Sequence, residues 1–454
     1  MEEATEGVSK TVKIAVPEFV AEVASPFAND LLDRGPRVRL LCDFGRSVSD
    51  HAVIAVDGGW GTGKTAFLMM CKAYLEQQEV RVAEFNAWTE SYTADPVFNL
   101  ASALAEVVEE DRRAKLLGAA KAIVVAAGKN LPLKVGEVVT EAAEAIAQDQ
   151  AFPNGLPEYR NCVRRFKKAL EQEAEKADGP LVVLVDELDR CLPQQVVEYL
   201  GAIHNLLAVP GVVVVLAINL EETAKGLEAV YGSAYGSERY LQRFFDLRMS
   251  LPGATGSDDL SGLVNHLREH LEIEVEADTS RGYIDGLLTT TALATGGALR
   301  DLQRVAQALR WTMAVGLESA ASWRINSPER YAECVRAALA LLILRHLDPE
   351  GYRLFTEAKA NPHSAMLRLH SHLLGAEPES AHAAFAMTAY FDLLSAETGG
   401  NQVTEEQFQE IADLYSFQNH RETYSRYNSF RQQIMRHLNG QVPQVVLAAV
   451  EMTT

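Results

Sequence analysis

Apolar and polar positions along the chain form two alternating kinds of segment. Short runs rich in Val, Ile and Leu predict buried strands, and each is followed by a segment whose apolar residues have helical spacing. The predicted strands cover residues 52–56, 80–85, 181–185 and 212–218, with the sequences AVIAV, VRVAEF, LVVLV and VVVVLAI. Near-continuous apolar strands that alternate with helices are typical of a parallel sheet covered on both faces. The pattern therefore predicts an α/β fold.

The same pattern divides the chain into regions. Residues 1–50 form a lead with one candidate helix around RGPRVRLLCDF. Between the second and third strands, a stretch rich in Ala, Val, Glu and Lys predicts a helical insertion at about residues 105–165, broken near residues 128–132. From residue 253 onward the strand-like runs stop and helical periodicity dominates. We therefore expect a core at 51–252 and an all-helical C-terminal region at 253–454.

The sharpest motif directly follows the first predicted strand and directly precedes a predicted helix. It is GGWGTGKT at residues 58–65, which matches the pattern GxxxxGK[ST]. In that pattern glycines let backbone N–H groups curl around a phosphate, the lysine reaches phosphate oxygens, and the hydroxyl binds Mg²⁺. A Gly-rich turn that binds nothing would need neither the Lys-Thr pair nor both flanks. The predicted nucleotide-binding residues are Gly58, Gly59, Trp60, Gly61, Thr62, Gly63, Lys64, Thr65 and Ala66.

A second motif ends the third predicted strand, where LVVLV continues into Asp186 and Glu187. At the carboxyl end of a buried strand, Asp186 would hold Mg²⁺ together with Thr65, and Glu187 would orient and polarise the attacking water. The alternative is a strand end followed by a solvated acidic turn. The presence of GGWGTGKT, a phosphate-binding loop (P-loop), in the same chain disfavours this alternative. Asp189 and Arg190 have two open interpretations. In one, they adjust the ligand environment of the Mg²⁺ ion or contact a neighbouring subunit. In the other, they form a local ion pair.

Together these segments resemble the KAP family of P-loop NTPases. The resemblance rests on GGWGTGKT, on FNAWTESYTADPVFNLASAL at residues 85–104 and on VVLVDELDRC at residues 182–191, and it is firm from about residue 53 to residue 252. It implies a sheet of the additional-strand type, in which a further strand separates the P-loop strand from the strand that ends in the acid pair. Many members carry two transmembrane helices between these motifs. In this insertion the longest charge-free apolar stretch, AIVVAAG, has only seven residues.

The resemblance also implies roles for three more residues, each with an alternative. Asn219 would be a polar sensor of the γ-phosphate or the water, or else a cap of the following helix. Arg243 would be an arginine finger that completes a neighbouring subunit's site, or else a plain surface residue. Arg300 would reach from the helical region to the nucleotide, or else pair on its own helix. Phe85 and Trp88 we expect in the core rather than stacked on a base.

Composition limits the partners and the compartment. The chain has 42 Lys+Arg and 62 Asp+Glu, and its net charge of -20 repels nucleic acid at long range, so nucleic acid is a disfavoured partner. Residues 419–436 interleave Arg with Tyr and Phe, as in a single-strand stacking platform, although amphipathic helix packing explains the same spacing. The five cysteines form no CxxC pair, and MEEATEGVSK lacks an apolar export segment. We expect a reduced, cytoplasmic protein with no membrane span and no metal beyond Mg²⁺.

The expected function is ATP hydrolysis that drives a conformational switch or motor, with ATP and Mg²⁺ as cofactors. ATP is preferred over GTP because the GTP-specific [NT]KxD pattern does not follow the strand VVVVLAI. A slowly hydrolysing, nucleotide-gated scaffold and a P-loop kinase are the alternatives. We expect a homo-oligomer, or a protein partner bound through the helical region. The resemblance to bacterial KAP proteins further implies a setting in antiphage defence.

Overall fold

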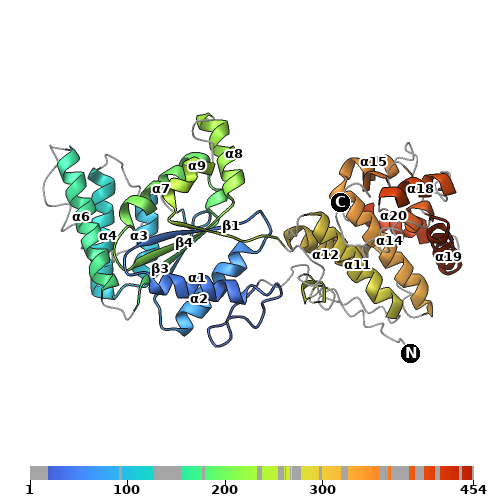
Figure 1. Cartoon of the computed structure of the whole chain (residues 1–454), viewed down its shortest axis with the longest axis horizontal. Helices are drawn as coiled ribbons and strands as arrows, with labels where there is room; N and C mark the ends of the chain where they lie inside the picture. The colour runs from blue at the N-terminus through green and yellow to red at the C-terminus, as the bar shows by residue number, and fades with distance from the viewer. Residues whose placement is uncertain are drawn as a thin grey trace, which may run out of the picture. The chain divides into compact units, whose positions relative to one another are not determined.

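The computed structural model divides the chain into two compact units, which are described separately here (Figure 1). The sheet unit runs from Phe19 to Pro252, and the helical unit begins at Gly253. The structure describes residues 19–91, 95–126, 155–175, 179–232, 238–253, 260, 262–265, 267, 278–295, 299–317, 326–356, 363, 367–369, 388–393, 403–414, 420–438 and 442–451.

Five parallel strands form the centre of the sheet unit. They are β1 (Ala52–Asp57), β2 (Val82–Asn86), β3 (Leu181–Asp186), β4 (Val212–Ile218) and β5 (Leu247–Ser250), in the order β2-β3-β4-β1-β5. β4 pairs with both β1 and β3, so it separates the strand that leads into GGWGTGKT from the strand that ends at Asp186. This confirms the additional-strand arrangement. The edge strand β5 was not predicted, because its four residues are half polar and none is buried.

Alternate residues of each central strand face opposite layers, which explains the continuous apolar runs in the sequence. In β1, Val53 and Ala55 pack into the core on one face, and Ile54 and Val56 pack into the core on the other. All six residues of β1 and all seven of β4 are buried. The central strands are therefore apolar on both faces, as expected for a parallel sheet that is covered on both sides. The predicted α/β class is confirmed.

Helices cover the two faces of this sheet. One face carries α1 (Gly35–Ser47) and α2 (Lys64–Gln77). The opposite face carries α3 (Pro96–Glu106), α4 (Glu110–Ala126), α6 (Gly155–Ala174), α7 (Pro193–Leu206) and α8 (Leu220–Tyr231). The short elements η2 (Leu188–Arg190), α9 (Glu238–Leu241) and η3 (Gln242–Phe244) complete the unit. The layers leave the carboxyl ends of the strands together at one edge.

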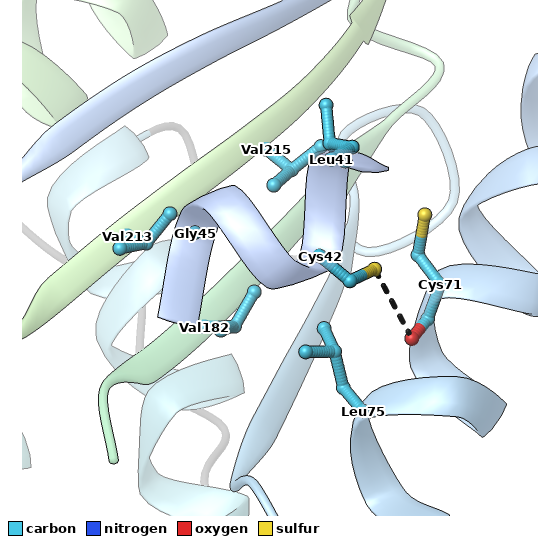
Figure 2. Close-up of a pocket in the computed structure, with 8 residues that line it drawn as sticks. All are labelled: Leu41, Cys42, Gly45, Cys71, Leu75, Val182, Val213 and Val215. Atoms are coloured by element: carbon cyan, nitrogen blue, oxygen red, sulfur yellow. Dashed lines mark hydrogen bonds between the residues drawn. The ribbon is translucent and has the colours of Figure 1, made fainter. Parts of the chain in front are cut away.

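The candidate helix of the N-terminal lead is α1, and it belongs to the sheet unit. Figure 2 shows Leu41 and Cys42 of α1 facing Cys71 and Leu75 of α2 across a small apolar cavity over the sheet. The Cys42 Sγ lies 3.9 Å from the backbone oxygen of Cys71. Burial is the largest cause of a raised pKa at the Cys71 thiol, so these sulfurs behave as apolar packing atoms.

The predicted insertion begins and ends in two helices that pack side by side, α4 and α6 (Figure 1). Arg112 near the start of α4 pairs with Glu173 near the end of α6, at 2.8 Å between Nη1 and Oε1. The two helices therefore run in opposite directions. Residues 127–154 between them, including the predicted break at 128–132, lie outside the described residues.

The helical unit is all-helical in the part that the structure describes. Its elements are α11 (Asp278–Ala294), α12 (Leu299–Trp311), η4 (Thr312–Gly316), α14 (Pro328–Leu347), α15 (Pro349–Thr356), α18 (Glu405–Leu414), α19 (His420–Leu438) and α20 (Val442–Glu451). Helix α14 is the centre, because it contacts α11, α12, α15, α19 and α20 and is buried from Ala332 to Leu344.

Helix α19 contains most of the Arg- and aromatic-rich stretch considered as a stacking platform. Tyr427 and Ile434 are buried, and the Tyr427 ring stacks on Phe408 of α18 with 4.5 Å between centroids. The Tyr427 hydroxyl also donates to the carboxylate of Asp392. These side chains are used for packing inside the helical unit, as the amphipathic interpretation required.

Candidate functional site

The loop between β1 and α2 turns tightly at the carboxyl edge of the sheet. Gly61 and Gly63 have φ of 79° and 86°, in the left-handed region that favours glycine, and α2 begins immediately after Gly63. At Gly58 a Cβ would lie 2.7 Å from the backbone oxygen of Leu251 and 2.7 Å from Thr62 Oγ1. Backbone geometry therefore requires glycine at three of the four glycine positions of the motif.

The ammonium group of Lys64 is held by three oxygens. Its Nζ donates to the backbone oxygens of Gly58 at 2.8 Å and Gly59 at 3.1 Å, and it lies 3.4 Å from Oδ2 of Asp189. Both side chains of this ion pair are about nine-tenths buried or more, at 10% and 5% exposed. Asp189 therefore forms an ion pair, but not a local one, because its partner Lys64 is 125 positions away in the sequence and is brought close by the strand order.

Asp186 and Thr65 meet where β3 ends beside the first turn of α2. The Thr65 hydroxyl lies within hydrogen-bonding reach of the Asp186 carboxylate, and the backbone N–H of Glu187 donates to Asp186 Oδ1 at 2.8 Å. Burial raises the pKa of Asp186, the nearby charges of Glu187 and Asp189 raise it further, and the two hydrogen bonds oppose this. The Thr65 hydroxyl and the Asp186 carboxylate thus place two hard oxygen ligands next to each other.

This oxygen pair fits Mg²⁺. Magnesium in nucleotide sites is bound by one or two protein oxygens, and waters and substrate phosphates complete its coordination. Thr65 and Asp186 supply such a donor set without a dedicated cage. Within the described ranges, no group of three or more His, Cys, Asp or Glu could hold a metal ion by itself.

The position of the Glu187 side chain is set by its backbone conformation and by contacts to both carboxylate oxygens. Its φ of 56° is unusual for a residue other than glycine. Asn86 donates from Nδ2 to Glu187 Oε2 at 3.3 Å, and Arg190 Nη2 lies 2.7 Å from Glu187 Oε1. Arg190 therefore forms a local ion pair, as one of its two interpretations predicted. The strained backbone and the two contacts aim this carboxylate at a defined place beside Asp186.

Asn86 is a site residue that was not singled out from the sequence. It ends β2, and its Oδ1 accepts from the backbone N–H groups of Trp88 and Thr89 at 3.1 and 3.0 Å. Its side chain thereby holds the turn after β2 and contacts Glu187 with its other end. Its position in the sequence could have identified it, because Asn86 is a polar residue at the end of a predicted strand, as Asp186 and Asn219 also are.

Asn219 caps the next helix. It follows β4, is 6% exposed, and its Oδ1 accepts from the backbone N–H of Glu222 at 3.2 Å in the first turn of α8. Asp57 at the end of β1 accepts the backbone N–H of Leu220 at 2.9 Å and binds Nε of Arg248 in β5 at 3.0 Å. These contacts join β1, β4, β5 and α8 at the same edge. The sensor role of Asn219 remains a prediction.

The two other predicted arginines lie in different places. Arg243 is exposed in η3, and its guanidinium lies 5.1 Å from the centre of the Tyr240 ring. It precedes β5, whose parallel pairing with β1 puts this end of the strand opposite the edge that carries the P-loop. Arg300 is exposed at the start of α12 in the helical unit. Their roles toward a neighbouring subunit and toward the nucleotide remain predictions.

The aromatic residues near the site differ from one another. Phe85 is 1% exposed, as expected for a core residue. The expectation for Trp88 was wrong, because this side chain is 55% exposed on the turn after β2. Trp60, at the tip of the P-loop, is also 55% exposed, and Ala66 is half-buried in the first turn of α2.

Comparison with known proteins identifies the family. Residues 39–315 match the KAP family P-loop domain, which is more than half of the chain. A search of curated proteins found no significant match. No helix among the described residues has the length and apolar character needed to cross a bilayer.

Solved structures of origin recognition proteins are similar to this chain at low identity. One is the structure of Drosophila ORC bound to DNA, with 13% identity, coverage of 91% of this chain and 86% of that chain, and a TM-score of 0.37. Another is the Aeropyrum pernix ORC2 protein in its ADP form, with 13% identity, 96% of each chain and a TM-score of 0.32. The family match, which spans the P-loop and the acid pair of β3, shows that the chain belongs to the KAP family of P-loop NTPases.

Proposed function

We propose that this protein hydrolyses ATP with Mg²⁺ and uses the cycle to switch its conformation. One observation carries the proposal: Lys64, the Thr65–Asp186 oxygen pair and the fixed Glu187 carboxylate lie together at the carboxyl edge of one sheet. In parallel α/β sheets this edge is where ligands bind. A lysine, a metal-binding oxygen pair and a carboxylate base are the groups that phosphoryl transfer to water requires.

Each residue has a separate task in the proposed reaction. The backbone N–H groups of the P-loop and the Lys64 ammonium hold the β- and γ-phosphates. Thr65 and Asp186 would bind Mg²⁺, which neutralises charge on the phosphate oxygens. Glu187 orients the attacking water and accepts its proton, with Asn86 and Arg190 fixing its carboxylate. Lys64 exchanges its contacts with Gly58, Gly59 and Asp189 for contacts with phosphate oxygens.

The proposal is tested with the full chain by measuring nucleotide binding and phosphate release in parallel. Trp60 lies in the P-loop and is largely exposed, so its fluorescence should report nucleotide binding. Lys64→Ala should abolish both the fluorescence change and phosphate release. Glu187→Gln should keep the fluorescence change and lower phosphate release by roughly 100-fold or more. Trp60→Phe identifies the source of the optical signal, because this variant should lose the fluorescence change.

Two outcomes would replace ATP hydrolysis by one of the alternatives. A wild-type chain that binds ATP but releases no phosphate would be a nucleotide-gated scaffold. Transfer of the γ-phosphate to a protein or small molecule instead of water would make it a kinase. If Glu187→Gln hydrolyses ATP at the wild-type rate, Glu187 is not the residue that activates water.

The proposed assembly rests on Arg243, which is exposed and lies away from the P-loop of its own chain. A neighbouring copy would receive this residue as an arginine finger. Mass measurement with and without a nonhydrolysable ATP analogue tests this. A monomer under both conditions would exclude the arrangement. Partner binding through the helical unit and a setting in antiphage defence belong to the same proposal, and the family membership is their support.

A further inference from the structure

One surface of the sheet unit has a charge opposite to that of the whole protein. Residues 115–126 of α4 and 155–168 of α6 contain seven Lys and Arg and one Glu, a net charge of +6, whereas the chain carries -20. We call their exposed basic side chains the basic patch. Its members are Lys115, Arg160, Arg164, Arg165 and Lys168, with the partly exposed Lys121 beside them.

The geometry of α6 points this charge outward. Arg160, Arg164 and Lys168 follow each other at steps of four residues, so they lie along one face, about 6 Å apart per step. The opposite face is buried, with Phe166 and Leu170 at 1% and 0% exposed in the core of the sheet unit. Figure 1 shows α6 as the outer helix of the α4–α6 pair, at one end of the unit.

The basic patch is not neutralised within the part of the chain that the structure describes. None of its six members lies within 4.0 Å of an acidic group there, although Arg164 donates to the side-chain oxygen of Asn161. Some basic residues elsewhere in the unit do have acidic partners, for example Lys72 with Glu84 at 2.6 Å and Lys225 with Glu221 at 2.8 Å. Six cations that lie together with no acidic partner among the described residues form a surface suited to a polyanion.

We infer that the basic patch binds the phosphate backbone of a nucleic acid without reading its sequence. Arg guanidinium groups form bidentate hydrogen bonds with phosphate, and three of the six residues of the basic patch are Arg. The acidic remainder of the protein does not prevent this, because charges farther away than about 8–10 Å are largely screened at physiological salt. The whole-chain charge therefore disfavours nucleic acid only at long range.

A lipid surface fits the same helix less well. Helices that lie in a membrane interface insert an apolar face, with the basic residues flanking it. The apolar face of α6 is already buried against the sheet unit, where Cys162 and Phe166 are 4% and 1% exposed. Apart from the exposed Tyr159, the described side chains that α6 presents outside are mainly polar and charged, which suits contact with phosphates better than insertion into a bilayer.

The test measures binding of the full chain to a short fluorescent DNA duplex of random sequence by anisotropy, between roughly 50 and 200 mM salt. If six phosphates are contacted, the slope of log K against log[salt] is about -5. The variant Arg160→Glu/Arg164→Glu/Lys168→Glu should bind at least about 10-fold more weakly, and its slope should be smaller by about 3. Its ATP hydrolysis and thermal unfolding should match those of the wild type, because the patch lies outside the candidate site.

A charge-matched control separates the patch from net charge. Arg46→Glu/Lys225→Glu/Arg353→Glu changes the charge by the same amount at exposed positions on other helices and should bind DNA almost like the wild type. The inference is overturned if the wild type does not bind the duplex, if the patch variant binds equally well, or if the control loses as much affinity. Binding to vesicles with anionic lipid but not to DNA would overturn it in favour of a membrane.

Discussion

Oδ2 of Asp189 lies 3.4 Å from Nζ of Lys64, so the lysine of the P-loop is paired with the acidic cluster that follows β3. Both side chains are almost completely buried. A carboxylate that neutralises this ammonium competes with phosphate for it. The pair therefore links the candidate phosphate site directly to the strand that carries Asp186 and Glu187.

Replacing Asp189 by Asn should have two opposite effects. The fold should lose stability, by about 1–3 kcal/mol, because a buried ammonium loses its counter-charge. Nucleotide should bind about 3- to 10-fold more tightly, because Lys64 no longer shares its charge with a carboxylate. Thermal unfolding and Trp60 fluorescence measure the two effects. Glu84→Gln, which breaks the exposed pair with Lys72, should change neither. Weaker nucleotide binding by Asp189→Asn would mean that Asp189 itself contributes to the nucleotide site.

The two adjacent glycines at the start of the P-loop should differ sharply in tolerance. Gly58→Ala places a Cβ 2.7 Å from the Leu251 oxygen, so the loop must shift, at a cost of about 1–3 kcal/mol and with loss of nucleotide affinity. Gly59→Ala meets nothing closer than the Thr62 methyl at 3.7 Å and should unfold like the wild type. Paired thermal melts and nucleotide titrations check this. Equal behaviour of the two variants would show that Gly58 is not held against Leu251 in this way.

Asn86 should act as a positioning residue for Glu187. Asn86→Asp keeps an oxygen for the backbone N–H groups of Trp88 and Thr89 but removes the donor to Glu187. We expect it to lower kcat by about 10- to 100-fold and to leave nucleotide affinity unchanged, since a hydrogen bond to a charged group contributes about 1.5–3 kcal/mol. Asn86→Ala, which also loses the turn contacts, should lower kcat equally and reduce thermal stability as well. A purely structural role would change stability in both variants and spare kcat in Asn86→Asp.

Cys191 should be an unreactive thiol despite its partial exposure. Burial, and then the charges of Asp189 and Glu187, raise the pKa of this thiol to about 11. At pH 8 its thiolate fraction is therefore small, and iodoacetamide should modify it roughly 100-fold more slowly than a free cysteine. The rate should increase with pH up to about 11. Fast labelling at pH 8, followed by peptide mass mapping of Cys191, would show that the neighbouring carboxylates do not control it.

Local patterns in the sequence determined four of the five strands of the sheet unit and the positions of its two motifs along the chain. The spacing of GGWGTGKT, the buried runs of four strands and the acid pair after LVVLV depend on neighbours within a few residues, and each lies where it was predicted. Asn219 as a helix cap and Phe85 as a core residue follow from the same short-range rules.

The tertiary structure alone decided which of these local features touch. The order β2-β3-β4-β1-β5 brings Lys64 to Asp189 and Asn86 to Glu187, pairs separated by more than 100 positions. It also made an edge strand of the half-polar β5 and exposed Trp88. Such contacts depend on long-range strand pairing, whose register no local spacing encodes, because the intervening chain can have any length that closes the crossover.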